Sequence, residues 1–245
     1  MRKILSILIC TLFSSSAVWA ADAGKILKDM DVAMSGAADQ YMLYEIKDQQ
    51  PGKDERILGI EVTVKGDKRF TKFTAPSDIK GTKILVLSQT QMYVYLPSFK
   101  KIRRVASHVT KQGVMGTTFS NDDMALSSFA DKFTGAIQSD DKDSWVVAAT
   151  AKSGSDAPYP KIHITIEKKR NLPLKLEYFN EKGKKLKTEN RTGYTCESKA
   201  CTATVHEMTD HTKNDQVTTL TRKKWKVNQG VKDRVFSKRH LQRAR

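Results

Sequence analysis

Apolar residues alternate with polar residues over long stretches of this 245-residue chain, and that period of two is the feature that most constrains its fold. Residues 162–166 read Ile-His-Ile-Thr-Ile, and residues 58–64 read Leu-Gly-Ile-Glu-Val-Thr-Val. Because successive side chains of a strand point to opposite faces, such segments are half-buried strands. Further strands are predicted at 69–74, 83–88, 92–96, 144–152, 172–179, 184–192, 202–208 and 216–227.

Short turns separate most of these segments, and their order contains neither a strand–helix–strand alternation nor an internal repeat. The pattern predicts a mainly β protein with about ten or eleven antiparallel strands, arranged as one curved sheet or open barrel. Two segments break the pattern. An apolar stripe at three- and four-residue steps predicts a helix over residues 22–35. Residues 98–135 form a long irregular excursion, which we interpret as a lid-like flap carrying a short helix over 122–130.

The N-terminus has the three-part layout of a secretory signal peptide. Arg2 and Lys3 precede an apolar run at residues 4–13, and Val18 and Ala20 occupy the −3 and −1 positions of a cut after Ala20. The run is too short to cross a bilayer as a helix, which leaves a retained anchor as the less favoured alternative. We therefore expect residues 1–20 to be a signal peptide, residues 21–245 to be a single domain, and the mature protein to reside in the periplasm.

Cys196 and Cys201 are the cysteines that would remain after this cleavage, and predicted strands flank them. In an exported protein such a pair predicts a disulfide that closes a hairpin, worth about 2–3 kcal/mol in the chain-entropy model. A zinc site is the alternative, but it would require further ligands at suitable spacing.

Motifs that carry catalysis are missing from the sequence. It has no G-x-S-x-G nucleophile motif, no phosphate-binding loop and no dinucleotide-binding glycine pattern. His206 and His211 are five residues apart, whereas a helical zinc motif needs four, so we expect exposed strand histidines. The chain is therefore predicted not to be an enzyme and to need no metal or cofactor.

Positive charge dominates, with 43 Lys and Arg against 27 Asp and Glu. Basic clusters occur at 100–104, 168–170, 182–187, 222–226 and 238–245. Nucleic acid is not expected as a partner in the periplasm, whereas phospholipid head groups and lipopolysaccharide phosphates are abundant anions there. A generally basic, solvated surface explains the same charge equally well.

Three segments carry a resemblance to a known family. They are Phe-Thr-Ala-Pro-Ser-Asp-Ile-Lys-Gly-Thr at 73–82, Met-Tyr-Val-Tyr-Leu-Pro-Ser-Phe-Lys-Lys-Ile-Arg-Arg at 92–104, and Val-Met-Gly-Thr-Thr-Phe-Ser-Asn-Asp-Asp at 114–123. Because these three segments occur in this order, the chain resembles the outer-membrane lipoprotein-sorting proteins with a LolA/LolB-like fold. The resemblance implies a half-open antiparallel barrel of about eleven strands, with a few helices covering the concave side above a hydrophobic cavity for lipid or lipoprotein acyl chains.

Candidate site residues follow from the strand pattern and this resemblance together. The expected cavity wall comprises Leu58, Ile60, Val62, Phe73, Leu85, Leu87, Val94, Leu96, Ile162, Ile164, Leu174 and Leu176. Met115, Phe119 and Phe129 would belong to the flap, and Lys100, Lys101, Arg103 and Arg104 would meet anionic head groups or a partner.

The expected function is that of a soluble periplasmic carrier, which moves a lipid or a lipoprotein acyl chain between envelope membranes. An inner-membrane transporter and an outer-membrane acceptor are the candidate partners, with transient contact to membrane surfaces. The alternative is a solid-cored periplasmic accessory module of a membrane export system that binds no lipid itself.

Overall fold

The structure, a computed structural model, describes residues 22–88, 90–106, 113–126 and 128–243. The expected signal peptide, residues 1–20, lies outside the described residues. Within the described ranges, no helix combines the length and the apolar character needed to cross a bilayer.

In the described part of the chain, thirteen strands form one antiparallel sheet in the order β6-β5-β4-β3-β2-β1-β15-β14-β11-β10-β9-β8-β7. One half is the meander β1 (Gln40–Gln49), β2 (Arg56–Lys65), β3 (Lys68–Ala75), β4 (Lys83–Ser88), β5 (Gln91–Leu96) and β6 (Lys101–Arg104). The other half contains β7 (Phe133–Asp140), β8 (Ser144–Ala151), β9 (Lys161–Glu167), β10 (Leu172–Phe179), β11 (Lys185–Thr192), β14 (Val205–Asp210) and β15 (Gln216–Val227). β1 pairs with β15 and so joins the two halves.

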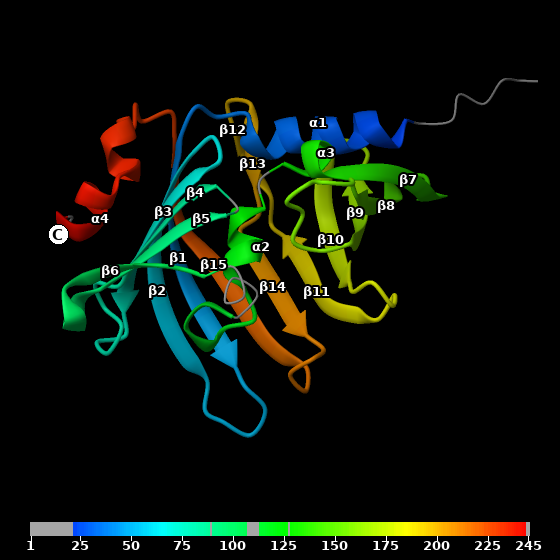
Figure 1. Cartoon of the computed structure of the whole chain (residues 1–245). Helices are drawn as coiled ribbons and strands as arrows, with labels where there is room; N and C mark the ends of the chain where they lie inside the picture. The colour runs from blue at the N-terminus through cyan, green and yellow to red at the C-terminus, as the bar shows by residue number, and fades with distance from the viewer. Residues whose placement is uncertain (1–21, 89, 107–112, 127, 244–245) are drawn as a thin grey trace, which may run out of the picture.

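The predicted fold class is confirmed, because the described sheet curves strongly but β6 and β7 at its two ends do not pair (Figure 1). Among the described residues the sheet has thirteen strands, whereas the sequence placed ten of them, because β1, β6 and β7 were not predicted. A separate hairpin, β12 (Thr195–Glu197) and β13 (Ala200–Thr202), pairs Cys196 with Cys201, and these two residues form a disulfide.

The predicted N-terminal helix is α1 (Ala23–Ser35), and Asp22 caps it by accepting a hydrogen bond from the Gly24 amide at 2.8 Å. The helix expected over 122–130 is instead two short helices. α2 (Asn121–Ala125) begins at a capping box formed by Ser120 and Asp123, and extended backbone at Leu126 ends it before α3 (Phe129–Lys132). Other helical elements among the described residues are η1 (Pro97–Phe99), η3 (Val114–Gly116), η4 (Asp233–Phe236) and α4 (Lys238–Arg243).

The two faces of the sheet are covered by different helices. Figure 1 shows α1 and α3 lying across one end of the concave side, α2 inside the curve, and α4 outside the sheet, where it contacts β4, β5 and β6. In β4, Ile84 and Val86 join the concave cluster, whereas Leu85 joins a convex cluster with Phe236 and Leu241. The concave face therefore holds the space in which a site can form.

Candidate functional site

A pocket of about 240 Å³ lies between the concave face of the sheet, the helical cover and the β12–β13 hairpin. It is lined by Met34, Ser35, Gln40, Met42, Tyr44, Ile46, Ile60, Val62, Val64, Gly66, Arg69, Phe73, Val114, Thr117, Phe119, Asp123, Leu126, Phe129, Glu189, Arg191, Tyr194, Cys201, Thr202, Ala203, His206 and Leu220. Its volume is close to the lower end of the roughly 300–1,000 Å³ typical of ligand sites.

One wall of the pocket is apolar. Inward-facing residues of neighbouring strands form it, including Met42 on β1, Ile60 and Val62 on β2, and Phe73 on β3. These strands lie side by side in register, with Met42 opposite Val62 and Ile60 opposite Phe73. The period-two pattern of the sequence thus becomes a continuous hydrocarbon surface facing the cavity.

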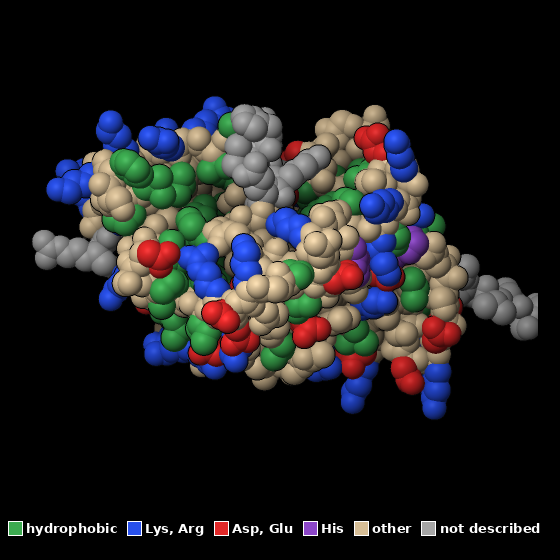
Figure 2. Space-filling view, turned by 90° about the horizontal axis from the view of Figure 1, so that it is seen from below, with side chains coloured by type: hydrophobic (Ala, Val, Ile, Leu, Met, Phe, Trp, Pro, Cys, Tyr) green, Lys and Arg blue, Asp and Glu red, His purple; other side chains and the backbone are tan. Residues whose placement is uncertain are grey.

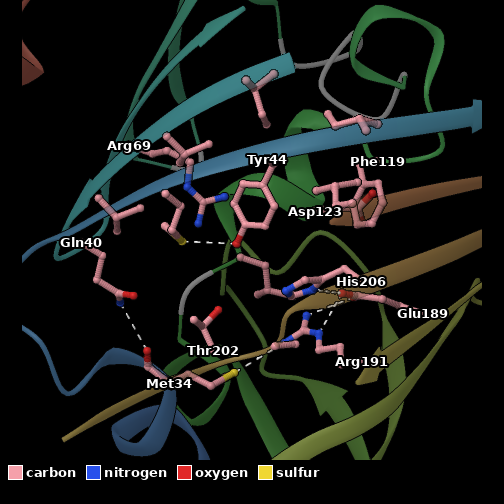
Figure 3. A pocket seen from close by; sticks show the side chains of 18 of the residues that line it. Met34, Gln40, Tyr44, Arg69, Phe119, Asp123, Glu189, Arg191, Thr202 and His206 are labelled. Atoms are coloured by element: carbon pink, nitrogen blue, oxygen red, sulfur yellow. Dashed lines mark hydrogen bonds and ion pairs between the residues drawn. The ribbon is translucent and has the colours of Figure 1, made fainter. Parts of the chain in front are cut away.

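The opposite wall carries a buried ionic cluster on β11 and β14, which Tyr178 of β10 supports from behind the pocket lining (Figure 3). Arg191 donates to both carboxylate oxygens of Glu189, from Nε at 2.7 Å and from Nη2 at 3.0 Å. The same carboxylate accepts a hydrogen bond from the Tyr178 hydroxyl at 2.7 Å and lies 3.0 Å from Nδ1 of His206. We refer to these four residues as the Glu189 cluster.

Electrostatics in the Glu189 cluster favour the ion pair. Burial alone would raise the pKa of Glu189, but the charge of Arg191 and the hydrogen bonds from His206 and Arg191 hold it well below its usual range. Burial lowers the pKa of His206, so its ring is neutral near pH 7. In that state Nδ1–H donates to Glu189, which leaves Nε2 as a bare acceptor; Nε2 is buried and has no hydrogen-bond partner in the described part of the chain.

Arg69 enters the pocket from β3, on the side opposite the Glu189 cluster. Its guanidinium points toward the Tyr44 ring (Figure 3). Burial lowers the pKa of Arg69, and the positive charge of Arg191 acts in the same direction. A guanidinium nevertheless stays protonated in proteins, so Arg69 is a permanent charge in a mainly apolar space.

Polar contacts fix the helical cover to the sheet. Asp123 of α2 accepts hydrogen bonds from Lys187 Nζ at 2.6 Å and from the Tyr159 hydroxyl at 2.5 Å. The neighbouring Thr118 hydroxyl donates to the Met208 carbonyl at 3.1 Å. Asp31 of α1 accepts from the backbone amides of Phe129 and Ala130, which caps α3. The residues between 113 and 132 that the structure describes are therefore held in place as a cover.

The disulfide hairpin completes the cover at the end of α1. A Cβ atom at Gly36, which follows α1, would lie 2.1 Å from the carbonyl oxygen of Lys199 in the hairpin turn. Only glycine allows this approach. Cys201 and Thr202 line the pocket, so the hairpin positions one of its walls.

The structure brings five of the predicted cavity and flap residues to the pocket: Ile60, Val62, Phe73, Phe119 and Phe129. Leu58 is buried behind them in the same concave cluster, against which Val94 and Met115 pack. Ile162, Ile164 and Leu176 belong to the core beneath α1, outside the pocket. Leu96 is half-buried and does not line the pocket.

Three of the proposed wall residues lie away from the concave face. Leu85 and Leu87 face the convex side, where Leu85 packs in the cluster of Phe236 and Leu241. Leu174 is an exposed residue of β10. The assignment failed for Leu85 and Leu87 because a strand with apolar residues on both faces gives no alternation from which to choose the inward side.

The candidate head-group residues Lys100, Lys101, Arg103 and Arg104 are exposed at the end strand β6, outside the pocket. Phe99 beside them is 61% exposed, and the guanidinium of Arg103 lies 5.7 Å from its ring centroid. Figure 2 shows Lys and Arg side chains spread among acidic and hydrophobic ones over the face it presents. Among the described residues visible on that face, the basic side chains form no single continuous patch.

Sequence reasoning missed the charged residues of the pocket. Arg69, Glu189 and Arg191 were not predicted as site residues, and His206 was wrongly expected to be exposed, since its side chain is only 18% accessible. The available signal was that Glu189 and Arg191 are two residues apart in a predicted strand and so share a face. No group of side chains suited to holding a metal ion occurs among the described residues.

Comparisons with known proteins agree with this architecture. A family model described as "Uncharacterized protein" matches residues 65–243. A search of curated proteins finds no match. A domain from Vibrio parahaemolyticus, titled as an outer membrane lipoprotein-sorting protein, is 26% identical with a TM-score of 0.81, over 90% of this chain and 98% of that one.

Two further solved structures share the fold at lower identity. A DUF1329 family protein from Desulfovibrio piger is 20% identical with a TM-score of 0.80, and a LolA superfamily protein from Nitrosomonas europaea is 21% identical with a TM-score of 0.76. Each alignment covers 90% of this chain and 100% of the other. The chain therefore belongs to the family whose model matches residues 65–243, and its fold is the LolA/LolB-like fold of the outer-membrane lipoprotein-sorting proteins.

Proposed function

We propose that the protein is a periplasmic carrier, which holds the hydrocarbon of a lipid or of a lipoprotein acyl chain in this pocket and moves it between envelope membranes. The observation that supports this most is a cavity of about 240 Å³ with one continuous apolar wall under a helical cover. Each methylene group buried there would contribute about 0.8 kcal/mol, so eight would supply about 6 kcal/mol before the cost of association.

The helical cover suits loading and release. Side-chain hydrogen bonds attach α2 and α3 to the rest of the molecule, and most of them involve two carboxylates, Asp123 and Asp31. Phe129 of α3 also packs in the apolar cluster beneath α1. Short helices attached in this way open at lower cost than strands that are hydrogen-bonded within the sheet. Opening at α2 and α3 would give hydrocarbon a route to the wall formed by β1–β3.

Contact with a membrane is assigned to the end strand β6. The exposed Phe99 ring beside Lys100, Lys101, Arg103 and Arg104 combines an apolar group with positive charge, the chemistry that favours an anionic lipid surface. Such contact would weaken as salt rises. Residues 1–20 would direct export, and an inner-membrane transporter and an outer-membrane acceptor would supply and receive the cargo.

Native mass spectrometry of protein purified gently from the periplasm tests the proposal. The wild type should retain bound lipid, whereas Val62→Phe should not, because the larger side chain would project from β2 into the pocket. Leu174→Phe is the matched control, since it adds an aromatic ring at an exposed position of β10. A wild type without lipid that also fails to bind a fluorescent fatty acid would instead support the accessory-module alternative.

A further inference from the structure

We propose that the pocket selects amphiphiles with one anionic head group, a carboxylate or a phosphate, which pairs with Arg69 while the hydrocarbon lies on the apolar wall. This inference rests on the proposed function, because it requires the pocket to accept hydrocarbon. It adds the chemical class of the cargo and the orientation in which the cargo binds, with its head inside the pocket.

The argument begins with the charges that line the pocket. Asp123 is paired with Lys187, whose Nζ lies 2.6 Å from its carboxylate. Glu189 is paired with Arg191. Across the part of the chain that the structure describes, Arg69 has no carboxylate within ion-pair distance. The pocket thus has one positive charge that the protein does not balance.

The position of Arg69 makes this charge available to a ligand. Its backbone lies between Val64 of β2 and Val86 of β4, two strands whose inward residues belong to the concave apolar cluster. Its guanidinium projects over Tyr44 into the same cavity as the apolar wall (Figure 3). The positive charge of Arg69 and the apolar wall are therefore adjacent within one pocket.

A purely apolar cargo would create an electrostatic conflict. In the empty pocket, water can solvate the guanidinium, but hydrocarbon filling the cavity would displace that water. A charge left without water or counter-ion in an apolar environment is strongly unfavourable. A carboxylate or phosphate removes the conflict, because it accepts two parallel hydrogen bonds from a guanidinium.

A second observation points to a polar ligand atom in the same cavity. Nε2 of His206 is buried without a hydrogen-bond partner among the described residues, while Nδ1 is engaged by Glu189. Buried polar atoms are rarely left unsatisfied. As an acceptor, Nε2 suits a hydroxyl of the head group or a water molecule that the ligand retains.

Calorimetric titration with three ligands of equal chain length tests the selectivity. Dodecanoate and dodecyl phosphate carry the two anionic heads, and dodecanol is the neutral reference, each used below its aggregation concentration. We expect wild-type protein to bind at least one of the anions about ten- to hundredfold more tightly than dodecanol, the range of a charge-assisted hydrogen bond. The stronger of the two anions identifies the head group.

Variants assign the selectivity to Arg69. Arg69→Met should bind all three ligands within about threefold of one another, and Arg69→Lys should retain part of the preference, because it keeps the charge without the planar fork. Arg239→Met makes the same chemical change at an exposed residue of α4 and should leave the selectivity intact. Thermal unfolding curves verify that the variants are folded.

The outcomes separate this inference from the proposed function. Equal binding of dodecanol and both anions by the wild type, or unchanged selectivity in a folded Arg69→Met, would overturn the head-group assignment while the carrier function stands. Failure of all three ligands to bind would overturn both. Anion selectivity that disappears in Arg69→Met and persists in Arg239→Met would establish the site.

Discussion

The ion pair between Glu189 and Arg191 gives the sharpest test of how the pocket is built. Glu189 is 2% exposed and accepts hydrogen bonds from Arg191 and Tyr178. Glu189→Leu would leave the Arg191 guanidinium buried without its counter-ion. Breaking a buried pair in this way costs about 3–5 kcal/mol. For a domain of this size, that corresponds to a fall in Tm of about 6–20 °C.

The double variant Glu189→Leu/Arg191→Met removes both charges. The remaining cost in the double variant is that the Tyr178 hydroxyl and the His206 N–H lose their hydrogen-bond acceptor. Each unsatisfied group costs about 1–3 kcal/mol of stability. Since the unpaired charge is gone, we expect the double variant to be more stable than Glu189→Leu alone. The coupling energy between the two positions should be at least about 2 kcal/mol, well above the roughly 0.5 kcal/mol of independent sites.

Equilibrium unfolding in urea measures this cycle, because urea adds no salt that would screen the charges. The pH dependence gives an independent check. Since the pKa of Glu189 is held below its usual range in the folded protein, the ion pair stabilises above about pH 4 and is lost as the pH falls further. If the two substitutions prove additive, or if Glu189→Leu costs less than about 1 kcal/mol, the description of a tightly paired, buried cluster is incorrect.

Three further outcomes are expected. Burial raises the pKa of Asp31 to about 6, so the folded protein holds a proton there that the unfolded chain releases near pH 4. The contribution of Asp31 to stability should therefore fall as the pH rises from about 4 to 6. Measurements of Tm across this range should show the fall in the wild type and not in Asp31→Asn. Gly135→Val should lower the free energy of unfolding, measured in urea, by about 1–3 kcal/mol, because a Cβ atom there would already lie 3.0–3.1 Å from Ala23 and Leu27 of α1. An unchanged stability would show that α1 does not pack this closely against β7. Replacing Cys196 and Cys201 by Ser should cost about 2 kcal/mol for so short a loop, and a reductant should then have no further effect on the Tm, in contrast to the wild type.

Much of the fold could be predicted because the strands that cross the concave face alternate clearly between apolar and polar residues. Residues 58–64 and 162–166 alternate in the sequence and are β2 and β9 in the structure. β6 was missed because Lys-Ile-Arg-Arg at an end of the sheet is mostly exposed, and solvent exposure leaves no alternation to detect. The helix expected over 122–130 is broken at Leu126, where the backbone turns extended and α3 begins on a cap supplied by Asp31, about a hundred residues away in the sequence.

The site was less accessible to sequence reasoning, for a physical reason. An apolar residue in a strand predicts burial, but it does not say whether the side chain meets a cavity, as Val62 does, or a closed core, as Ile164 does. Charged residues have the opposite difficulty. Arg69 reads as a surface residue beside a turn, and only the curvature of the sheet, which turns the inward face of β3 toward Tyr44, places it in the pocket.

Photo-cross-linking in intact cells tests the central proposal most directly, because it records what occupies the pocket in the envelope. A benzophenone amino acid at Leu220, which lines the pocket, should yield adducts with the mass of a lipid, while the same group at the exposed Leu174 should not. Adducts at Leu220 that contain only protein or water, in a protein that folds normally and reaches the periplasm, would contradict the account of this protein as a lipid carrier.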